Sequence, residues 1–384
     1  MNCDIAIIGG GPVGSALALA LQDSPFRVCL LEACASASTD ARALALSYGS
    51  RLLLERLGIW HRLADVSAIS TIHISQKQSF GRAVLRAQEM NVADLGYVLP
   101  YPTLQNALTG ALHACVKGVT GVYGANVISL AGDADHAVIK YRQGTMEHTL
   151  HARLAVVADG GRLLAEQYPP QIHDYGQSAL ITHVTSSARS PGTAFERFTP
   201  QGPIALLPYK DGYEIVWTAP HQRIQEMLVW DDATFLSELH AHFGDRVGEF
   251  LTAGTRSSYP LGLKRAQDLS PMPHTVLLGN AAQTMHPVAG QGFNLGLRDA
   301  WDLAQQILDT QAATLGDAAM LAAYRSRRQL DREAGIRFTD TLVRLFSNDL
   351  PVIGAARAAS LSMLDCLPFA KRFVAKRMMF GANG

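Results

Sequence analysis

The chain has 384 residues, of which 48% are hydrophobic and 17% charged, so it is long enough for two packed domains and too apolar for a disordered chain. Its 33 basic and 33 acidic side chains cancel, which disfavours nucleic acid as a partner because backbone phosphates demand a basic surface. The five cysteines form no Cys-x-x-Cys pair and the 13 histidines no His-Glu-x-x-His motif, so we expect no metal site.

The chain begins with the pattern of a β-α-β unit. A buried strand is predicted over 4–9, because residues 5–8 form a continuous apolar run. An Ala- and Leu-rich helix is predicted over 13–22, and a second strand over 27–32. This order predicts a nucleotide-binding α/β fold.

A glycine motif lies between the first strand and the helix. Gly9, Gly11 and Gly14 match the pattern Gly-x-Gly-x-x-Gly. Gly9 permits a tight turn, Gly11 lets the backbone approach a pyrophosphate, and Gly14 lets the helix pack closely on the strand. Glu32 ends the second strand, where a carboxylate can accept hydrogen bonds from ribose hydroxyls. The segment therefore predicts a site for the ADP half of a dinucleotide.

Two later segments indicate which dinucleotide it is. Asp159-Gly160 follows a buried strand over 154–157, and Gly279-Asn280 follows another over 276–278. A glycine-rich loop then opens a helix near residue 294. Each segment alone could be an ordinary strand-to-helix loop. Together they favour a flavin, because a helix N-terminus suits the electron-rich edge of the reduced ring.

The middle of the chain, about 175–258, alternates apolar and polar residues and has a hairpin turn signal at Lys210-Asp211-Gly212. The expected fold class is α/β: a Rossmann-like FAD-binding domain with an inserted, mostly antiparallel β-sheet substrate domain and a C-terminal helical tail. We expect the FAD-binding domain at 1–70, 98–172 and 258–335, the substrate domain at 71–97 and 173–257, and the helical region at 336–384.

The three glycine segments resemble those of the group A flavoprotein aromatic hydroxylases, the para-hydroxybenzoate hydroxylase fold, over residues 1 to about 350. The resemblance implies an enzyme with FAD as cofactor and NAD(P)H as transient reductant. Where the family usually has Gly-Asp, this chain has Gly-Asn, which keeps an acceptor oxygen but loses the charge. The cofactor-binding residues that the resemblance implies are Gly9, Gly11, Gly14, Glu32, Arg42, Gln105, Asp159, Gly160, Gly279, Asn280, Gly290, Gln291, Gly292 and Asn294.

The sequence Gly-Asn-Ala-Ala-Gln-Thr-Met-His-Pro at 279–287, with the segments at 41–46 and 194–199, resembles the ubiquinone-biosynthesis hydroxylases. This branch implies that O2 and a flavin C4a-hydroperoxide hydroxylate a polyprenyl phenol, 2-polyprenyl-6-methoxyphenol, para to its hydroxyl in a dry pocket. Three alternatives stay open: another ring hydroxylase of the pathway, a prenyl-lipid flavin reductase, and a non-catalytic flavin-bound subunit of a biosynthetic complex.

Catalytic and substrate residues are harder to identify. His286 and Pro287 lie where the family places the reactive face of the flavin, although a loop-shaping role is also open. Glu196 and Arg197 are adjacent on a predicted strand, so they point to opposite faces, one of which can be the cavity. The substrate candidates are Phe195, Arg197, Tyr209 and Trp217, with core packing as the alternative for the aromatic residues.

The tail from residue 350 combines apolar residues with five basic side chains and a single acidic one, Asp365. A basic amphipathic helix can lie on an anionic membrane surface, and a helix covering the core is the alternative. We expect a cytoplasmic protein with peripheral contact to the inner face of the membrane through this region.

Overall fold

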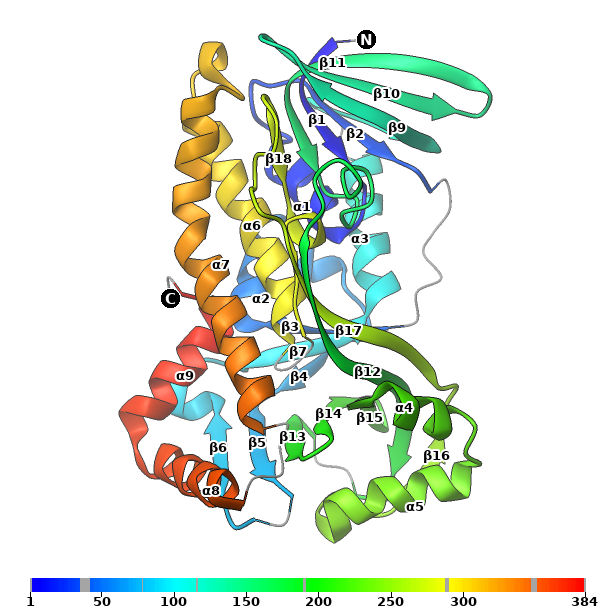
Figure 1. Ribbon diagram of the computed structural model, residues 1–384, viewed down its shortest axis with the longest axis vertical. Coiled ribbons are helices and arrows are strands. Elements are labelled where there is room, and N and C mark those ends of the chain that lie inside the picture. Colours follow the sequence, from blue (N-terminus) through cyan, green and yellow to red (C-terminus); the bar gives the residue numbers. More distant parts are fainter. Residues whose placement is uncertain are drawn as a thin grey trace.

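The computed structural model describes residues 2–34, 42–77, 79–114, 117–188, 191–286, 290–346 and 351–382, except for the side chains of 343–346 and 351–357. Figure 1 shows two sheets at opposite ends of an elongated molecule, with long helices running along one side. Within this part of the chain, no helix is long and apolar enough to cross a membrane.

The first sheet carries the predicted β-α-β unit, since helix α1 (Pro12–Ala20) joins β1 (Asn2–Ile8) to its parallel neighbour β2 (Val28–Glu32). Ile5, Ala6 and Ile7 are fully buried, as expected for a parallel strand covered on both faces. Its other strands are β8 (Val119–Tyr123), β9 (Ala125–Gly132), β10 (Ala137–Gln143), β11 (Met146–Val157) and β18 (Thr275–Leu277).

Four helices pack against this sheet or against each other beside it. Helix α1 contacts both α3 (Tyr101–Ala114) and α6 (Gln291–Leu308), and α6 contacts the long helix α7 (Ala318–Phe346). Since α1 and α6 both begin near the carboxyl ends of parallel strands, their N-termini lie at the edge where α/β folds bind ligands.

The second sheet is larger and almost entirely antiparallel, with β13 and β5 as the one parallel pair of neighbours among the described strands. One of its faces packs against α4 (His221–Leu228) and α5 (Asp232–Phe243). In spatial order its strands are β19 (Gln283–Thr284), β17 (Ser257–Arg265), β12 (Gln171–Ser186), β15 (Gly212–Pro220), β14 (Gly202–Tyr209), β13 (Thr193–Thr199), β5 (Thr71–Gln76) and β6 (Arg82–Arg86), with β16 (Phe250–Ala253) beside β12.

A small sheet and the C-terminal helices complete the fold. The small sheet contains β3 (Ala43–Ser47), β7 (Gly96–Pro100) and β4 (Ser67–Ile69), and α2 (Tyr48–Arg56) follows β3. Helix α8 (Pro351–Cys366) packs on β6, and α9 (Pro368–Phe380) packs on α2 (Figure 1). Short 3-10 helices cover Trp60–Arg62, Ala87–Met90, Gly244–Val247, Gly279–Ala281 and Ala312–Thr314.

The expected α/β fold with an inserted antiparallel sheet and a helical tail is therefore confirmed. The expected domain boundaries at 172/173 and 257/258 fall at the beginnings of β12 and β17. These two long strands run from the middle of the molecule into its lower part (Figure 1), and the division into two domains remains a proposal.

Candidate active site

Two cavities meet between the sheets. The first has a volume of about 600 Å³ and lies at the carboxyl ends of β1 and β2. The second, of about 440 Å³, lies between the small sheet and the large one. The residues that line both cavities are Arg42, Tyr101, Asn280, Gly292 and Phe293. Because these residues are shared, one extended ligand can occupy both spaces.

The glycine motif forms one wall of the first cavity. A Cβ atom on Gly14 would come within 2.0 Å of the Gly9 carbonyl oxygen, so Gly14 is required by the contact between α1 and β1. A Cβ on Gly11 would instead meet only the Tyr101 hydroxyl, at 3.9 Å, and would project into the cavity that Gly11 lines. The space beside Gly11 therefore fits a ligand that approaches the backbone, as a pyrophosphate does.

The polar residues expected around the first cavity hold its loops together. Glu32 lines the cavity, and its carboxylate accepts hydrogen bonds from the amides of Gly10 and Cys34. Gln105 donates to the Gly10 carbonyl at 2.8 Å but does not itself line either cavity among the described residues. Both side chains therefore fix the glycine loop, and the ribose contact of Glu32 remains a proposal.

The second motif, Asp159-Gly160, also borders the first cavity. The Asp159 carboxylate accepts hydrogen bonds from the amides of Gly161 at 2.8 Å and Leu163 at 2.6 Å, so it shapes the turn after β11. Arg42 lies across the junction of the two cavities, with its guanidinium 5.8 Å from the centre of the Tyr101 ring. This arrangement places a cation where the phosphates of an extended ligand would pass.

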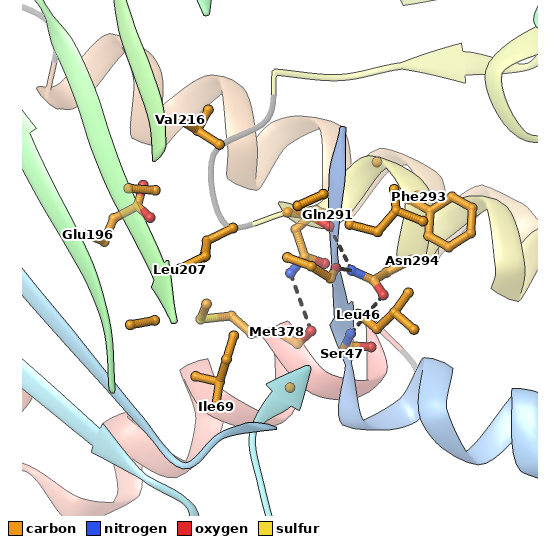
Figure 2. A pocket seen from close by; sticks show the side chains of 18 of the residues that line it. Leu46, Ser47, Ile69, Glu196, Leu207, Val216, Gln291, Phe293, Asn294 and Met378 are labelled. Atoms are coloured by element: carbon orange, nitrogen blue, oxygen red, sulfur yellow. Dashed lines mark hydrogen bonds between the residues drawn. The ribbon is translucent and has the colours of Figure 1, made fainter. Parts of the chain in front are cut away.

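The N-terminus of α6 forms one wall of the second cavity. Gly290 lies just before the helix with φ +61°, and a Cβ on Gly292 would meet no atom within 4 Å. Asn294 is turned into the protein, where it donates to the Ala45 carbonyl and accepts from the Ser47 amide at 2.8 Å (Figure 2). The positive end of the α6 dipole therefore borders the cavity, while Asn294 fastens that helix to β3.

The opposite wall is the face of the large sheet that α4 and α5 leave uncovered. Its register aligns Glu196 with Ala205 and Val216 on adjacent strands, and all three line the cavity. Figure 2 shows Glu196 across the cavity from Gln291 and Asn294. Burial raises the pKa of Glu196 to about 7. Helix α9 closes a third side with its cavity-lining residues Ala375, Met378 and Met379.

The four substrate candidates do not all reach this cavity. Phe195 lines it. Arg197 lies on the other face of β13, where it donates to Ser75 at 3.3 Å. Tyr209 packs beside Val98 and Ala194 in a small core cluster. Trp217 packs against α5, with its ring 5.8 Å from that of Phe235.

Of the two catalytic candidates, His286 lines neither cavity among the described residues. His286 is fully buried and packs edge-on against the Tyr175 ring at 5.4 Å. Burial lowers the pKa of His286 to about 4, so its imidazole is neutral near pH 7. Pro287 lies outside the described residues. A catalytic role for either residue remains a proposal.

Among the cofactor candidates, Gly279 lies behind the cavity wall, where a Cβ would meet Val13 at 3.2 Å, whereas Asn280 lines both cavities. The sequence did not single out Tyr259, which lines the second cavity with Arg42 5.6 Å from its ring centre. The sequence alone does not place Tyr259 at the site, because its position depends on the pairing of β17 with β12.

Comparisons with known proteins identify the family of this chain. The model of the FAD binding domain family matches residues 2–339. The chain is 31% identical to the ubiquinone hydroxylase UbiL of Rhodospirillum rubrum, covering 98% of this chain and 89% of that protein. It is 30% identical to the 3-demethoxyubiquinol 3-hydroxylase of Escherichia coli, covering 96% of each.

A likeness to solved structures supports the fold. The p-nitrophenol 4-monooxygenase of Pseudomonas putida superposes with a TM-score of 0.79 over 99% of each chain, at 17% identity. Fold and site together define a dinucleotide-binding flavoprotein. The chain belongs to the FAD-binding-domain family of flavin-dependent monooxygenases. The expectations of an enzyme, of FAD as its cofactor and of NAD(P)H as its reductant are thereby confirmed.

Proposed function

We propose that this enzyme hydroxylates the aromatic ring of a polyprenyl phenol in ubiquinone biosynthesis, with 2-polyprenyl-6-methoxyphenol as its substrate. The observation that carries the proposal is the second cavity, an apolar space that contains a single acidic side chain among its described residues and opens into the dinucleotide site. The relatives described as hydroxylases of ubiquinone or demethoxyubiquinol support the same pathway.

In this proposal the first cavity holds the ADP half of the cofactor and the second holds the substrate ring. The first holds ADP against Gly11, with Arg42 beside the phosphates, and the amides at the start of α6 face the flavin ring. FAD, when bound and reduced by NAD(P)H, supplies the activation of O2 and the transfer of one oxygen atom. The protein orients the ring between α6 and the large sheet, and its apolar walls exclude water.

The cavity walls suit a ring that carries a hydrocarbon chain. Leu207 and Val216 of the sheet, Ile69 of the small sheet and Met378 of α9 all border it (Figure 2). Such side chains stabilise an isoprenoid chain by removing its apolar surface from water, at roughly 25 cal/mol per Å². The proposed substrate needs an apolar wall for the chain and one polar group for the hydroxyl, and this cavity offers both.

The first prediction concerns the substrate. Purified holoenzyme is mixed with NAD(P)H and, in turn, with short-chain 2-prenyl-6-methoxyphenol and with prenyl phenols that have a different vacant ring position. We expect the first compound to gain one oxygen para to its hydroxyl, as measured by product mass and NMR. Hydroxylation of another member of the panel alone would favour a different ring hydroxylase of the pathway. Reduction of a prenyl chain without O2 uptake would favour a reductase.

A membrane contact through α9 belongs to the same proposal. One face of this helix lines the cavity, while Phe369 and Phe373, one turn apart, are 71% and 61% exposed. Arg372 and Lys376 are exposed beside them. Exposed aromatic rings next to cations suit the surface of an anionic bilayer. With one face of α9 on the bilayer and the other on the cavity, a lipid substrate could move from the membrane into the cavity.

The second prediction tests this contact. The double variant Phe369→Ser/Phe373→Ser should bind anionic vesicles at least about tenfold more weakly than the wild type, because two rings no longer bury their surface in lipid. Sedimentation with vesicles measures the binding. The matched control is Val229→Ser/Leu251→Ser, which removes two exposed apolar side chains that lie outside α9. Equal vesicle binding by all three proteins would count against the contact, and it would leave a surface on a biosynthetic complex as the proposed role.

A further inference from the structure

Glu196 is a carboxyl group in an unusual place. It lies on β13, and its strand register points it to the same side as Ala205 and Val216, into the second cavity. It is the only acidic side chain among the described residues that line this cavity. Figure 2 shows its side chain directed from the sheet toward the space bounded by Leu207 and Gln291.

No group in the described part of the chain satisfies this carboxyl. None of the hydrogen bonds or ion pairs found there involves Glu196, and desolvation alone accounts for its raised pKa of about 7. Its neighbour Arg197 points to the opposite face and bonds Ser75. The side chain is only partly exposed, and a carboxyl removed from water without a partner destabilises a fold more as a charge than when it is protonated. The position is therefore explained best by a partner that arrives with the substrate.

The other ionisable side chains that line the cavity are Arg42, Tyr101 and Tyr259. They form one group, because the Arg42 guanidinium lies 5.8 Å from the Tyr101 ring centre and 5.6 Å from that of Tyr259. Arg42 and Tyr101 also line the first cavity, so this group lies at the end where the dinucleotide passes. Glu196 is therefore the acceptor left for a substrate hydroxyl at the sheet wall.

We propose that the Glu196 carboxylate accepts a hydrogen bond from the phenol hydroxyl of the substrate and takes its proton as the ring is hydroxylated. The inference rests on the proposed function, since it requires a phenol in the second cavity. It makes Glu196 a catalytic residue, whereas the sequence indicated only that either Glu196 or Arg197 can face the cavity.

The proton transfer balances within the monooxygenase reaction. The phenol O–H bond breaks, its proton passes to a Glu196 oxygen, and its electron pair moves into the ring while the para carbon forms a bond to one oxygen atom of O2. The second oxygen atom leaves as water, with two electrons supplied by NAD(P)H. When the ring becomes aromatic again, its para hydrogen leaves as a proton to water and Glu196 returns its proton to the phenol oxygen. A positioned carboxylate typically accelerates such a step by 10²–10⁴-fold.

The test compares ligands that differ only in the hydroxyl proton. Oxidised holoenzyme without NAD(P)H is titrated with short-chain 2-prenyl-6-methoxyphenol or with its methyl ether, and binding is followed by the change in flavin absorption. At pH 8 the wild type should prefer the phenol roughly tenfold or more, because a hydrogen bond to a carboxylate is lost in the ether. The variant Glu196→Gln should bind the two ligands with nearly equal affinity.

The pH dependence gives a second readout that a merely structural role would not change. Since the pKa of Glu196 is raised to about 7, the carboxylate is present above pH 7 and is lost below it. The wild-type preference for the phenol should therefore weaken between pH 8 and pH 6. Glu196→Asp should regain part of this pH dependence and Glu196→Gln none of it. Glu249→Gln, at an exposed position of the same region, is the matched control and should behave as the wild type.

The inference and the proposed substrate fail in different ways. If Glu196→Gln keeps the wild-type preference and pH profile, the inference is overturned whatever the substrate is. The same comparison with 2-methoxyphenol and 1,2-dimethoxybenzene removes the prenyl chain. A wild type that prefers this simple phenol over its ether but does not bind the prenylated one supports Glu196 and contradicts the substrate. A wild type that prefers neither phenol over its ether overturns the inference.

Discussion

Replacing Gly11 by leucine is expected to abolish FAD binding and leave the apoprotein folded. A Cβ on Gly11 has only the Tyr101 hydroxyl as a neighbour, at 3.9 Å, so the protein has room for a side chain there. That room is the cavity in which the pyrophosphate of FAD would approach the backbone, and a leucine would fill it. We expect the affinity for FAD to fall at least about 100-fold, because a blocked phosphate contact loses several hydrogen bonds. The purified protein should then show little or no flavin in its visible absorption.

The matched variant is Gly14→Leu, which separates the cofactor from the fold. A Cβ on Gly14 would lie 2.0 Å from the Gly9 carbonyl oxygen, so any larger residue must push α1 away from β1. This variant should lose its circular dichroism melting transition or its soluble expression, whereas Gly11→Leu should keep both. A Gly11→Leu protein that is purified with stoichiometric FAD would show that the dinucleotide does not pass this point.

The largest expected effect on stability comes from Arg328, a guanidinium that is 1% exposed between α6 and α7. It lies 2.7 Å from Asp299, 2.6 Å from Asp302 and 2.9 Å from Asp331. Arg328→Met would leave these carboxylates without their shared cation, which costs about 3–5 kcal/mol when a buried ion pair loses one partner. We expect the melting temperature to fall by roughly 5 °C or more. FAD affinity should fall with it, because Asp299 lies on the helix that begins at the proposed flavin site.

The pH dependence of this loss has a definite sign. Burial raises the pKa of Asp299, and Arg328 opposes that shift. Without Arg328 the folded-state pKa of Asp299 rises further, so the deficit is largest above it and shrinks as the pH falls toward the ordinary carboxyl range of about 4. The control is Arg327→Met, because Arg327 is 42% exposed and lies 3.5 Å from Asp302. Equal melting temperatures for the two variants at pH 8 would contradict the assignment.

The parts of the fold that the sequence predicts well are those encoded in contiguous residues. The turn after β1 requires Gly9, with φ +106°, and the packing of α1 requires Gly14, so two glycines within six residues carry the geometry of the whole unit. The alternation in the middle of the chain likewise predicts an antiparallel sheet, because side chains on successive residues point to opposite faces. Both patterns are local and appear in the structure where they were expected.

What the sequence could not provide is the pairing of distant elements. Alternation shows that Glu196 and Arg197 face opposite ways, but only the register with β14 and β15 shows that Glu196 has the cavity side. The sequence pattern of Trp217 fits a pocket residue equally well, and only the strand order shows that it packs against α5. The role of α9 was also hidden, since Met378 reaches the cavity from near the end of the chain. Asp299 belongs to a glycine-rich segment typical of flavin sites, yet its partner Arg328 is 29 residues away.

The central claim, that this flavoprotein transfers oxygen to a prenylated phenol, is tested most directly with isotopic O2. Holoenzyme, NAD(P)H and short-chain 2-prenyl-6-methoxyphenol are incubated under ¹⁸O2, and the product is measured by mass spectrometry. We predict one heavy oxygen atom in the ring product for each phenol consumed, with none when the label is in water instead. A phenol that stays unchanged with fully FAD-loaded protein, or that takes its new oxygen from water, would contradict the claim.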